Sequence, residues 1–275
     1  MQDATVANTA SAEPLLLEAR PHPRIALLTL NRPATRNALS LAMMRALHEA
    51  VDALGADDDI SAIVLAANGP VFSSGHDLKE LTAHRADPDK GLAFYTEAMG
   101  RCAAMMQAIV ACPKPVIAAV TGTATAAGCQ LVATCDLAVA AEGAHFATPG
   151  VNIGLFCSTP MVALSRNVSR KRAMEMLLLG EMLTASEAAE YGLVNRVAPA
   201  ADVLPAALAM ADKIAAKSPL TVSIGKRAFY AQAEMPLADA YAYAAQVMVD
   251  NMMARDAEEG IGAFLGKRKP EWKGC

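Results

Sequence analysis

The sequence predicts an α/β fold followed by a helical C-terminal region. Over the first two thirds of the 275 residues, short apolar runs of strand length alternate with stretches of helical spacing. From Ser169 onward the spacing is helical almost to the end of the chain. Hydrophobic residues make up 54% and aromatic residues only 4%, so the expected core is aliphatic. Such an alternation implies a sheet covered by helices.

The first third of the chain supplies a hairpin, a helix and a strand. Two alternating runs in residues 15–30, separated by proline and histidine, predict an antiparallel pair. Ser40 is a plausible N-cap for a helix that begins at the next residue. Residues 60–67 predict a short buried strand closed by an Asn-Gly turn. Residues 72–81 are expected to be a loop that leads into a helix.

The middle of the chain continues the alternation. Residues 91–111 have helical spacing, and Pro113 and Pro115 end that helix. A strand is expected in residues 115–122, and a helix is expected to start near Ala127. Residues 135–151 predict a strand, a turn and a second strand. These patterns divide the chain into three parts, which are a loose terminus (1–13), a core (14–168) and a helical region (169–275).

Composition excludes several classes of function. The net charge is −4, and no block of like charges indicates a nucleic-acid or membrane surface. No apolar run predicts a transmembrane helix, and residues 1–13 have the pattern of neither an export signal nor a transit peptide. The six cysteines form no Cys-x-x-Cys pair, which favours small buried hydrophobic residues over metal ligands or catalytic thiols. Reduced cysteines predict a cytoplasmic protein.

Five segments, in this order and spacing, resemble the crotonase (enoyl-CoA hydratase/isomerase) superfamily. The likeness runs from about Leu15 to Trp272. A single matching segment would be weak evidence for the family, whereas five in the family's order are strong evidence. Three of the segments are also similar in amino-acid sequence to one branch of the family. The segments read "FSSGHDLKE", "PKPVIAAVTG", "AAGCQLVATCDLAVA", "FATPGVNIGLF" and "EGIGAFLGKRKP".

The resemblance implies a crotonase-like spiral of ββα repeats with a C-terminal helical trimerisation region. Family members form homotrimers, often stacked as hexamers, and bind acyl-CoA thioesters. Coenzyme A is then part of the substrate, and neither a separate cofactor nor a metal is expected. The core (14–168) would hold the acyl-CoA site, and residues 169–275 would serve oligomerisation and CoA contact.

The resemblance also implies an oxyanion hole made by the backbone N–H groups of His76 and Ala127. Such donors stabilise the charge that develops on a thioester oxygen. A close approach of the carbonyl would explain the small residues of "TGTATAAGCQ". A helix starting at Ala127 would place its positive end at the same oxygen. The alternative is that these small residues only allow tight packing of a helix on a sheet.

Further substrate contacts are implied along the CoA moiety. The stretch from His76 to Lys79 would line the adenine and pantetheine, although "HDLKE" also reads as an ordinary helix start with a capping aspartate. Phe264 and Lys267 would reach the CoA site of the next subunit, with Lys267 meeting a phosphate; Lys267 could equally belong to a solvated basic tail. The implied substrate-binding residues are Ser74, His76, Asp77, Leu78, Lys79, Ala127, Cys157, Phe264 and Lys267.

Both acids that a hydratase needs are replaced. Family hydratases hold and activate a water molecule with two glutamates, and the matching positions here are Gln130 and Gly150. Glutamine orients water but accepts no proton near pH 7, and glycine has no side chain. Ordinary hydratase or isomerase activity is therefore doubtful. The nearest substitutes are His76, Cys157, His145 and Asp136, and structural roles are favoured for the last two.

Three interpretations remain open from the sequence. The protein is an enoyl-CoA hydratase or isomerase with an atypical site, an oxyanion-hole enzyme of another type such as a decarboxylase or thioesterase, or a non-catalytic acyl-CoA-binding trimer. RNA binding, which one family member achieves through a lysine-lined helix, is set aside. The matching helix, "LAMMRALHEAVDAL", has one arginine and no lysine.

Overall fold

Residues 13–275 are described by a computed structural model, and they form the predicted α/β fold with two sheets. The larger sheet has the strand order β1-β2-β3-β5-β7-β10, and the smaller has β4-β6-β8-β9. The strands are β1 (Leu16–His22), β2 (Ile25–Leu30), β3 (Ala62–Ala67), β4 (Val71–Ser73), β5 (Val116–Val120), β6 (Thr123–Thr125), β7 (Leu137–Ala141), β8 (His145–Ala147), β9 (Leu183–Thr184) and β10 (Arg196–Ala198).

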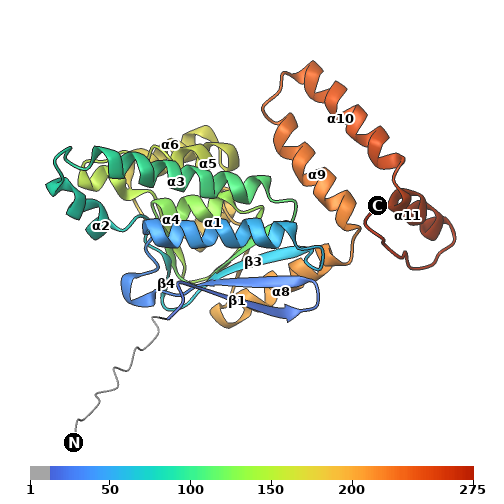
Figure 1. Cartoon of the computed structure of the whole chain (residues 1–275), viewed down its shortest axis with the longest axis horizontal. Coiled ribbons are helices and arrows are strands. Elements are labelled where there is room, and N and C mark those ends of the chain that lie inside the picture. The colour runs from blue at the N-terminus through green and yellow to red at the C-terminus, as the bar shows by residue number, and fades with distance from the viewer. Residues whose placement is uncertain (1–12) are drawn as a thin grey trace, which may run out of the picture.

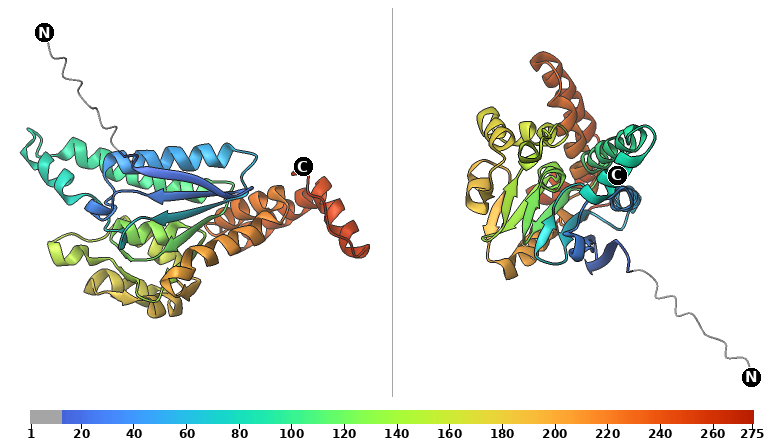
Figure 2. Two further views of the ribbon diagram at one scale, coloured as in Figure 1. Left: turned by 90° about the horizontal axis from the view of Figure 1, so that it is seen from below. Right: turned by 90° about the vertical axis from the view of Figure 1, so that its left-hand side faces the viewer.

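The helices follow the predicted alternation. They are α1 (Leu41–Ala56), α2 (Leu78–Ala83), α3 (Leu92–Ala111), α4 (Ala127–Thr134), α5 (Pro160–Asn167), α6 (Arg170–Leu179), α7 (Ala185–Glu190), α8 (Val203–Ala215), α9 (Pro219–Gln232), α10 (Leu237–Met252) and α11 (Arg255–Leu265). The larger sheet lies between α8, which packs on five of its strands, and the α1–α3 pair (Figures 1 and 2).

Strand pairing confirms the expected hairpin and explains the buried runs. β1 pairs antiparallel with β2, whereas β2, β3, β5, β7 and β10 pair in parallel. Every residue of β5 is buried, as expected for a parallel strand covered on both faces. The sequence did not predict β4 as a strand. It has only three residues, and its pairing with β6 joins segments about fifty residues apart, which no local pattern reveals.

Two predicted helix starts are confirmed by their caps. The Ser40 hydroxyl accepts a hydrogen bond from the Met43 backbone N–H, 3.2 Å away. The Asp77 carboxylate accepts from the backbone N–H groups of Lys79 and Glu80. These side chains satisfy amides that have no acceptor within the helix. The capping interpretation of Asp77 is therefore correct.

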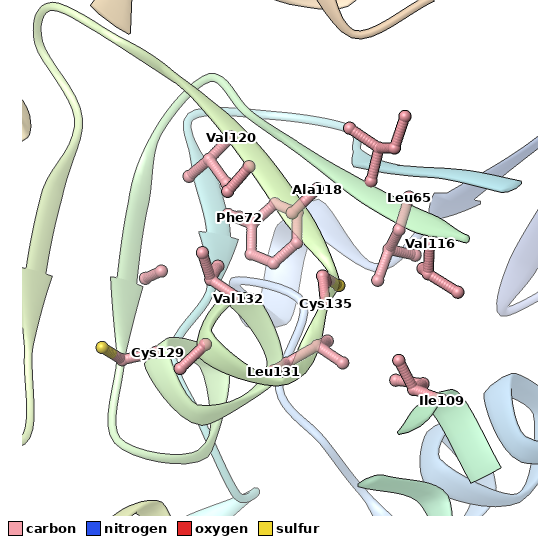
Figure 3. Packing of buried hydrophobic residues seen from close by; sticks show 14 of the residues in the cluster. Leu65, Phe72, Ile109, Val116, Ala118, Val120, Cys129, Leu131, Val132 and Cys135 are labelled. Carbon is pink, nitrogen blue, oxygen red and sulfur yellow. The ribbon is translucent and has the colours of Figure 1, made fainter. Parts of the chain in front are cut away.

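The core is aliphatic and includes most of the cysteines. Figure 3 shows Leu131, Val132 and Cys135 from the α4 segment packed against Phe72 and Val120 from the neighbouring strands. All six cysteines are free, and five are buried, whereas Cys275 is exposed. Burial raises the pKa of the Cys102 thiol to about 11 and that of the Cys129 thiol to about 12. These cysteines behave as the small hydrophobic residues that the sequence indicated.

The region after residue 169 divides into two parts. Residues 183–215 join the body of the molecule, because β9 extends the smaller sheet, β10 pairs with β7, and α8 packs on the larger sheet. Only α9, α10 and α11 project from the body as a helical arm (Figure 1). The predicted boundary after residue 168 therefore precedes elements of the core, and the appendage begins near Pro219.

Three further predictions concern the N-terminal residues, membrane-spanning helices and metal sites. The expected loose terminus lies, apart from Glu13, outside the described residues. Within the described residues no helix has both the length and the apolar character needed to cross a bilayer. The same residues hold no cluster of three or more His, Cys, Asp or Glu side chains that could bind a metal ion.

Candidate active site

Three parallel strands of the smaller sheet bring the implied site residues to one edge. β4 pairs in parallel with β6, and β6 with β8, so their carboxyl ends lie side by side. Residues 74–77 follow β4, residues 126–127 follow β6, and residues 148–150 follow β8. The carboxyl edge of parallel strands is a common place for ligand sites in α/β proteins.

The His76 and Ala127 segments lie close together at this edge. Gly75 has a positive φ of 87°, and a Cβ atom built on it would lie 3.0 Å from the Ala127 backbone nitrogen. Ala127 is the first residue of α4, so its N–H has no acceptor within the helix. In residues 13–275 neither the His76 nor the Ala127 N–H donates to a protein acceptor. Two neighbouring amides therefore remain available to a ligand.

Backbone strain occurs at the residue that positions the second amide. Ala126 has φ 51° and ψ −122°, a conformation that residues with a Cβ rarely adopt. The Ala126 N–H donates to the Ala147 carbonyl, 2.9 Å away, which ties this turn to the end of β8. Strained residues of this kind concentrate at functional sites.

Two glycines of the segment "TGTATAAGCQ" (residues 121–130) are explained by packing. A Cβ on Gly128 would lie 2.2 Å from the Ser73 carbonyl oxygen, and one on Gly122 would lie 2.1 Å from that of Pro70. Both positions therefore need glycine to bring α4 and β6 against β4. The packing alternative is correct for these two residues, and the same close packing brings Ala127 next to Gly75.

Gln130 is held inside the protein by α3. Its side chain lies on α4, the residue is 4% exposed, and its Oε1 atom is 3.9 Å from the Cys102 Sγ atom. The raised pKa of Cys102 keeps that thiol protonated at neutral pH, so the thiol donates to the amide oxygen. The surroundings of Gln130 thus suit a neutral amide.

Position 150, where the resemblance implies a glutamate in hydratases, is closed by its own loop. A Cβ on Gly150 would lie 2.7 Å from the Leu155 carbonyl oxygen and 2.9 Å from the Cys157 Sγ atom. The Leu155 N–H also donates to the Gly150 carbonyl, 2.9 Å away. Any larger side chain at position 150 would require residues 150–157 to move. Burial raises the pKa of the Cys157 thiol, which disfavours the nucleophilic thiolate.

The other proposed acid–base groups differ in their surroundings. Burial lowers the pKa of His76, and its Nε2 atom is buried without a partner among the residues that the structure describes, so the ring is neutral near pH 7. His145 Nδ1 lies 3.1 Å from the Gly143 carbonyl at the start of β8. Asp136 forms an ion pair with Lys226 at the opposite end of α4. The structural roles favoured for His145 and Asp136 agree with these contacts.

Comparison with known proteins now identifies the family. The family model described as enoyl-CoA hydratase/isomerase matches residues 21–275. The chain belongs to this family. It has the crotonase fold of that family, and it is 48% identical to human enoyl-CoA hydratase domain-containing protein 3 over 271 residues, which are 98% of this chain and 88% of the relative.

Solved structures of enoyl-CoA hydratases are similar in both sequence and fold. An enoyl-CoA hydratase from Mycobacterium smegmatis superposes with a TM-score of 0.90 at 52% identity, covering 94% of this chain and 99% of its own. Human enoyl-CoA hydratase domain-containing protein 3 superposes with a TM-score of 0.89, covering 94% of this chain and 100% of its own. This human protein belongs to the branch of the family that three of the sequence segments resemble.

The comparison overturns one expectation. The human and rat relatives are both named as mitochondrial, so the prediction of a cytoplasmic protein is wrong. The reasoning relied on free cysteines, which indicate only an environment that keeps thiols reduced. That property does not distinguish the cytosol from other reducing compartments.

The remaining implied contacts of this enoyl-CoA hydratase/isomerase family member lie far apart within one chain. Leu78 and Lys79 are exposed on α2, and Phe264 is 83% exposed at the end of α11. Lys267 follows α11 and is also exposed. Figure 1 places α2 and α11 at opposite ends of the molecule. One subunit therefore does not bring these two groups together.

Sequence reasoning missed two residues of the site. Ala126 was counted only as one of several small residues, and its strained conformation follows from pairing with β8. Thr148 was not considered, yet its hydroxyl is fully buried without a protein partner among residues 13–275. The Thr-Pro pair before Gly150 was its only signal, and that pair is common in ordinary turns.

Proposed function

We propose that this family member binds acyl-CoA thioesters with the thioester oxygen at the His76 and Ala127 amides. The proposal depends on one observation, which is that two adjacent backbone N–H groups have no acceptor in residues 13–275. The amides are fixed by β4, β6 and the start of α4. Fixed donors stabilise an enolate-like oxyanion better than mobile ones do.

The acid–base half of hydration is absent from this proposed site. Gln130 cannot accept a proton near pH 7, and Gly150 has no side chain. Among the substitutes that sequence reasoning suggested, His76 is the neutral base nearest the two amides, and its ring is hydrogen-bonded to the Leu39 backbone. We therefore expect thioester binding with hydration far below that of a hydratase with both glutamates.

A second candidate is a reaction that needs an oxyanion hole but no protein base. Decarboxylation of a malonyl-type thioester generates the enolate directly, so the two amides alone would assist it. The replacement of both acids favours this candidate over isomerisation, which needs a proton carrier. A non-catalytic acyl-CoA-binding protein fits the same replacements.

The proposed assembly is a homotrimer or a hexamer of two trimers. The arm (α9–α11) exposes large apolar side chains, including Leu237, Tyr241 and Met253, at 75%, 73% and 83% exposure. A patch of this kind is typical of a surface that binds another protein. In such an assembly Phe264 and Lys267 would reach the CoA of a neighbouring subunit. Neither nucleic acid nor membrane is proposed as a partner.

The test compares two ligands that differ only in the carbonyl oxygen. Isothermal titration would measure the Kd of butyryl-CoA and of its thioether analogue S-butyl-CoA. We expect the thioester to bind about five- to tenfold more tightly, the value of one or two hydrogen bonds. Equal affinities would show that no amide pair holds the thioester oxygen.

The catalytic part is tested with crotonyl-CoA, malonyl-CoA and the Gln130→Glu variant. We expect little hydration by the wild type. Hydration by the wild type at the rate of an ordinary hydratase would contradict the proposed loss of acid–base chemistry. Release of carbon dioxide from malonyl-CoA would select the decarboxylation candidate. The Gly150→Glu change is unsuitable as a simple restoration, because its Cβ would contact the Leu155 carbonyl oxygen.

A further inference from the structure

The loop between β2 and α1 is anchored by the side chain of Asn37. The residue is 0% exposed, and its side-chain nitrogen donates to the carbonyl oxygens of Asn68 and Val71 at 2.9 and 2.8 Å. Its Oδ1 atom accepts from the Arg32 N–H at 2.8 Å. Asn37 also has a positive φ of 49°, which asparagine tolerates better than most residues do. This one side chain therefore ties the loop to the turn that joins β3 and β4.

The same loop holds the end of β4, from which the chain leads to the His76 amide. The Ser73 hydroxyl is buried, donates to the Asn37 carbonyl at 2.9 Å and accepts from the Gly75 N–H at 3.3 Å. The Leu39 N–H donates to the Gly75 carbonyl at 2.8 Å. The loop thus holds the Gly75 carbonyl directly and the Gly75 N–H through the Ser73 hydroxyl.

The hydrogen bond at the Gly75 carbonyl sets the direction of the His76 N–H. The two groups belong to one peptide unit, which is planar, and the described residues contain no cis peptide bond. In a trans peptide unit the C=O and the N–H point in opposite directions. Because the carbonyl is fixed on Leu39, the His76 N–H is turned away from the loop. Rotation of this peptide unit would move that N–H relative to the neighbouring Ala127 amide.

We propose that Asn37 and Ser73 are positioning residues for the first of the two amides. They act through the peptide unit whose N–H meets the thioester oxygen, and they need no contact with the ligand themselves. The inference rests on the proposed thioester site and extends it to a loop outside that site. The buried hydrogen bonds orient the His76 N–H before a ligand binds, and a donor oriented in advance needs no reorganisation when it meets the thioester oxygen.

The experiment asks whether these two residues control the preference for a thioester oxygen. Isothermal titration would give the Kd of butyryl-CoA and of the thioether S-butyl-CoA for the wild type, Ser73→Ala and Asn37→Gly. Asn37→Gly keeps the positive φ while removing three side-chain hydrogen bonds. We expect the thioester preference to fall from about five- to tenfold in the wild type to about twofold or less in both variants. The Kd of the thioether, which has no carbonyl oxygen for the amide, should stay nearly the same.

Ser218→Ala is the matched control, because it also removes a buried serine hydroxyl that both donates and accepts. The Ser218 hydroxyl lies in the arm, donates to Asp256 at 2.6 Å and accepts from the Thr221 N–H at 3.2 Å. Thermal unfolding should show that Ser73→Ala and Ser218→Ala both destabilise the protein. Only Ser73→Ala should lose the thioester preference, and Ser218→Ala should keep that of the wild type.

The possible results separate this proposal from the thioester site. A wild-type preference retained in Ser73→Ala or in Asn37→Gly would overturn the proposal for that residue and leave the amide pair intact. An equal loss in Ser218→Ala would assign the effect to stability alone and overturn it for both. Failure of both site variants to fold would assign the two residues to the fold and overturn it as well. Equal affinities of the wild type for the two ligands would refute the amide pair itself, and this inference with it.

Discussion

The two ends of α4 bury polar groups in opposite ways. At its N-terminal end, the Ala127 backbone N–H and the buried hydroxyl of Thr148 have no partner among residues 13–275. At its C-terminal end, Asp136 accepts from the Lys226 ammonium at 2.7 Å, from the Val116 N–H at 2.7 Å and from the Tyr230 hydroxyl at 2.9 Å.

The charged end is a junction between the body and the arm. Lys226 comes from α9, and its Nζ atom also donates to the carbonyl oxygens of Ile109 and Lys114 at 2.9 and 3.1 Å. The side chains of Lys226 and Asp136 are 6% and 15% exposed. Burial and the neighbouring Asp136 raise the pKa of Tyr230, which keeps its hydroxyl protonated as a donor. Each charge is matched by several partners.

The difference separates polar groups that stabilise the fold from polar groups available to a ligand. Buried charges persist when they are paired and hydrogen-bonded. Unpaired buried groups destabilise the fold, so they persist where another requirement maintains them. Low exposure alone would not separate Asp136 from Thr148, and within residues 13–275 the completeness of their hydrogen bonding does.

The largest effect is expected at the charged end. Lys226→Met should leave Asp136 buried without its cation and lower the free energy of unfolding by about 3–5 kcal/mol. Chemical denaturation of the purified protein would measure it. As a matched surface change, Arg166→Met removes the exposed pair with Glu234 and should lower stability by about 1 kcal/mol or less. Equal effects of the two variants would show that the junction is no stronger than a surface ion pair.

A smaller effect is expected where α4 packs against β4. Gly128→Ala introduces a Cβ that would lie 2.2 Å from the Ser73 carbonyl oxygen, and it should lower the free energy of unfolding by about 1–3 kcal/mol. Gly100→Ala is the control, because its Cβ on α3 meets no heavy atom within 4 Å. That variant should gain up to about 1 kcal/mol from helix propensity. A harmless Gly128→Ala would refute the close packing.

Replacing the strained residue Ala126 is expected to stabilise the protein, whereas the two changes above destabilise it. Ala126→Gly should raise the free energy of unfolding by about 1 kcal/mol, because glycine adopts a positive φ without steric conflict. Ala103→Gly in the middle of α3 should lower it by a similar amount. If Ala126→Gly destabilised the protein as Ala103→Gly does, the backbone at the N-terminal end of α4 would not be strained.

The smallest effect concerns pH. The pKa of His76 is lowered by burial, so the unfolded chain binds a proton more readily than the folded one does. The stability due to neutral His76 is fully present above the pKa of the unfolded chain, about 6.5, and is lost as the pH falls through the folded pKa. A single proton limits this loss to about 1.4 kcal/mol per pH unit. Denaturation between about pH 8 and 5 would measure it.

A matched pair of variants isolates this contribution. His76→Phe removes the titrating group and should weaken the decrease in stability at low pH. His22→Phe, on the partly exposed ring that pairs with Asp212, should leave the decrease due to His76 in place. Identical pH profiles for His76→Phe and the wild type would mean that the ring is not buried as described.

Much of the fold could be predicted from local patterns. The β1–β2 hairpin, the Ser40 and Asp77 caps and the start of α4 each depend on neighbouring residues, and each was found as expected. The resemblance to the family also placed residues 76 and 127, which the fold brings together at one strand edge. The predictions failed where distant pairing decides, as with β4, β10 and the start of the arm.

The sequence by itself determined the alternation of strands and helices, the family, and a glutamine and a glycine at positions 130 and 150, because these are properties of residue identity and order. Only the tertiary structure decided that Gly150 is closed by Cys157 and Leu155, that Ala126 is strained, and that the Thr148 hydroxyl lacks a partner within residues 13–275. Each of these facts depends on which atoms lie within a few ångströms across chain segments far apart in sequence. Hydrogen bonding and steric contact act at that distance, and residue order alone does not specify it.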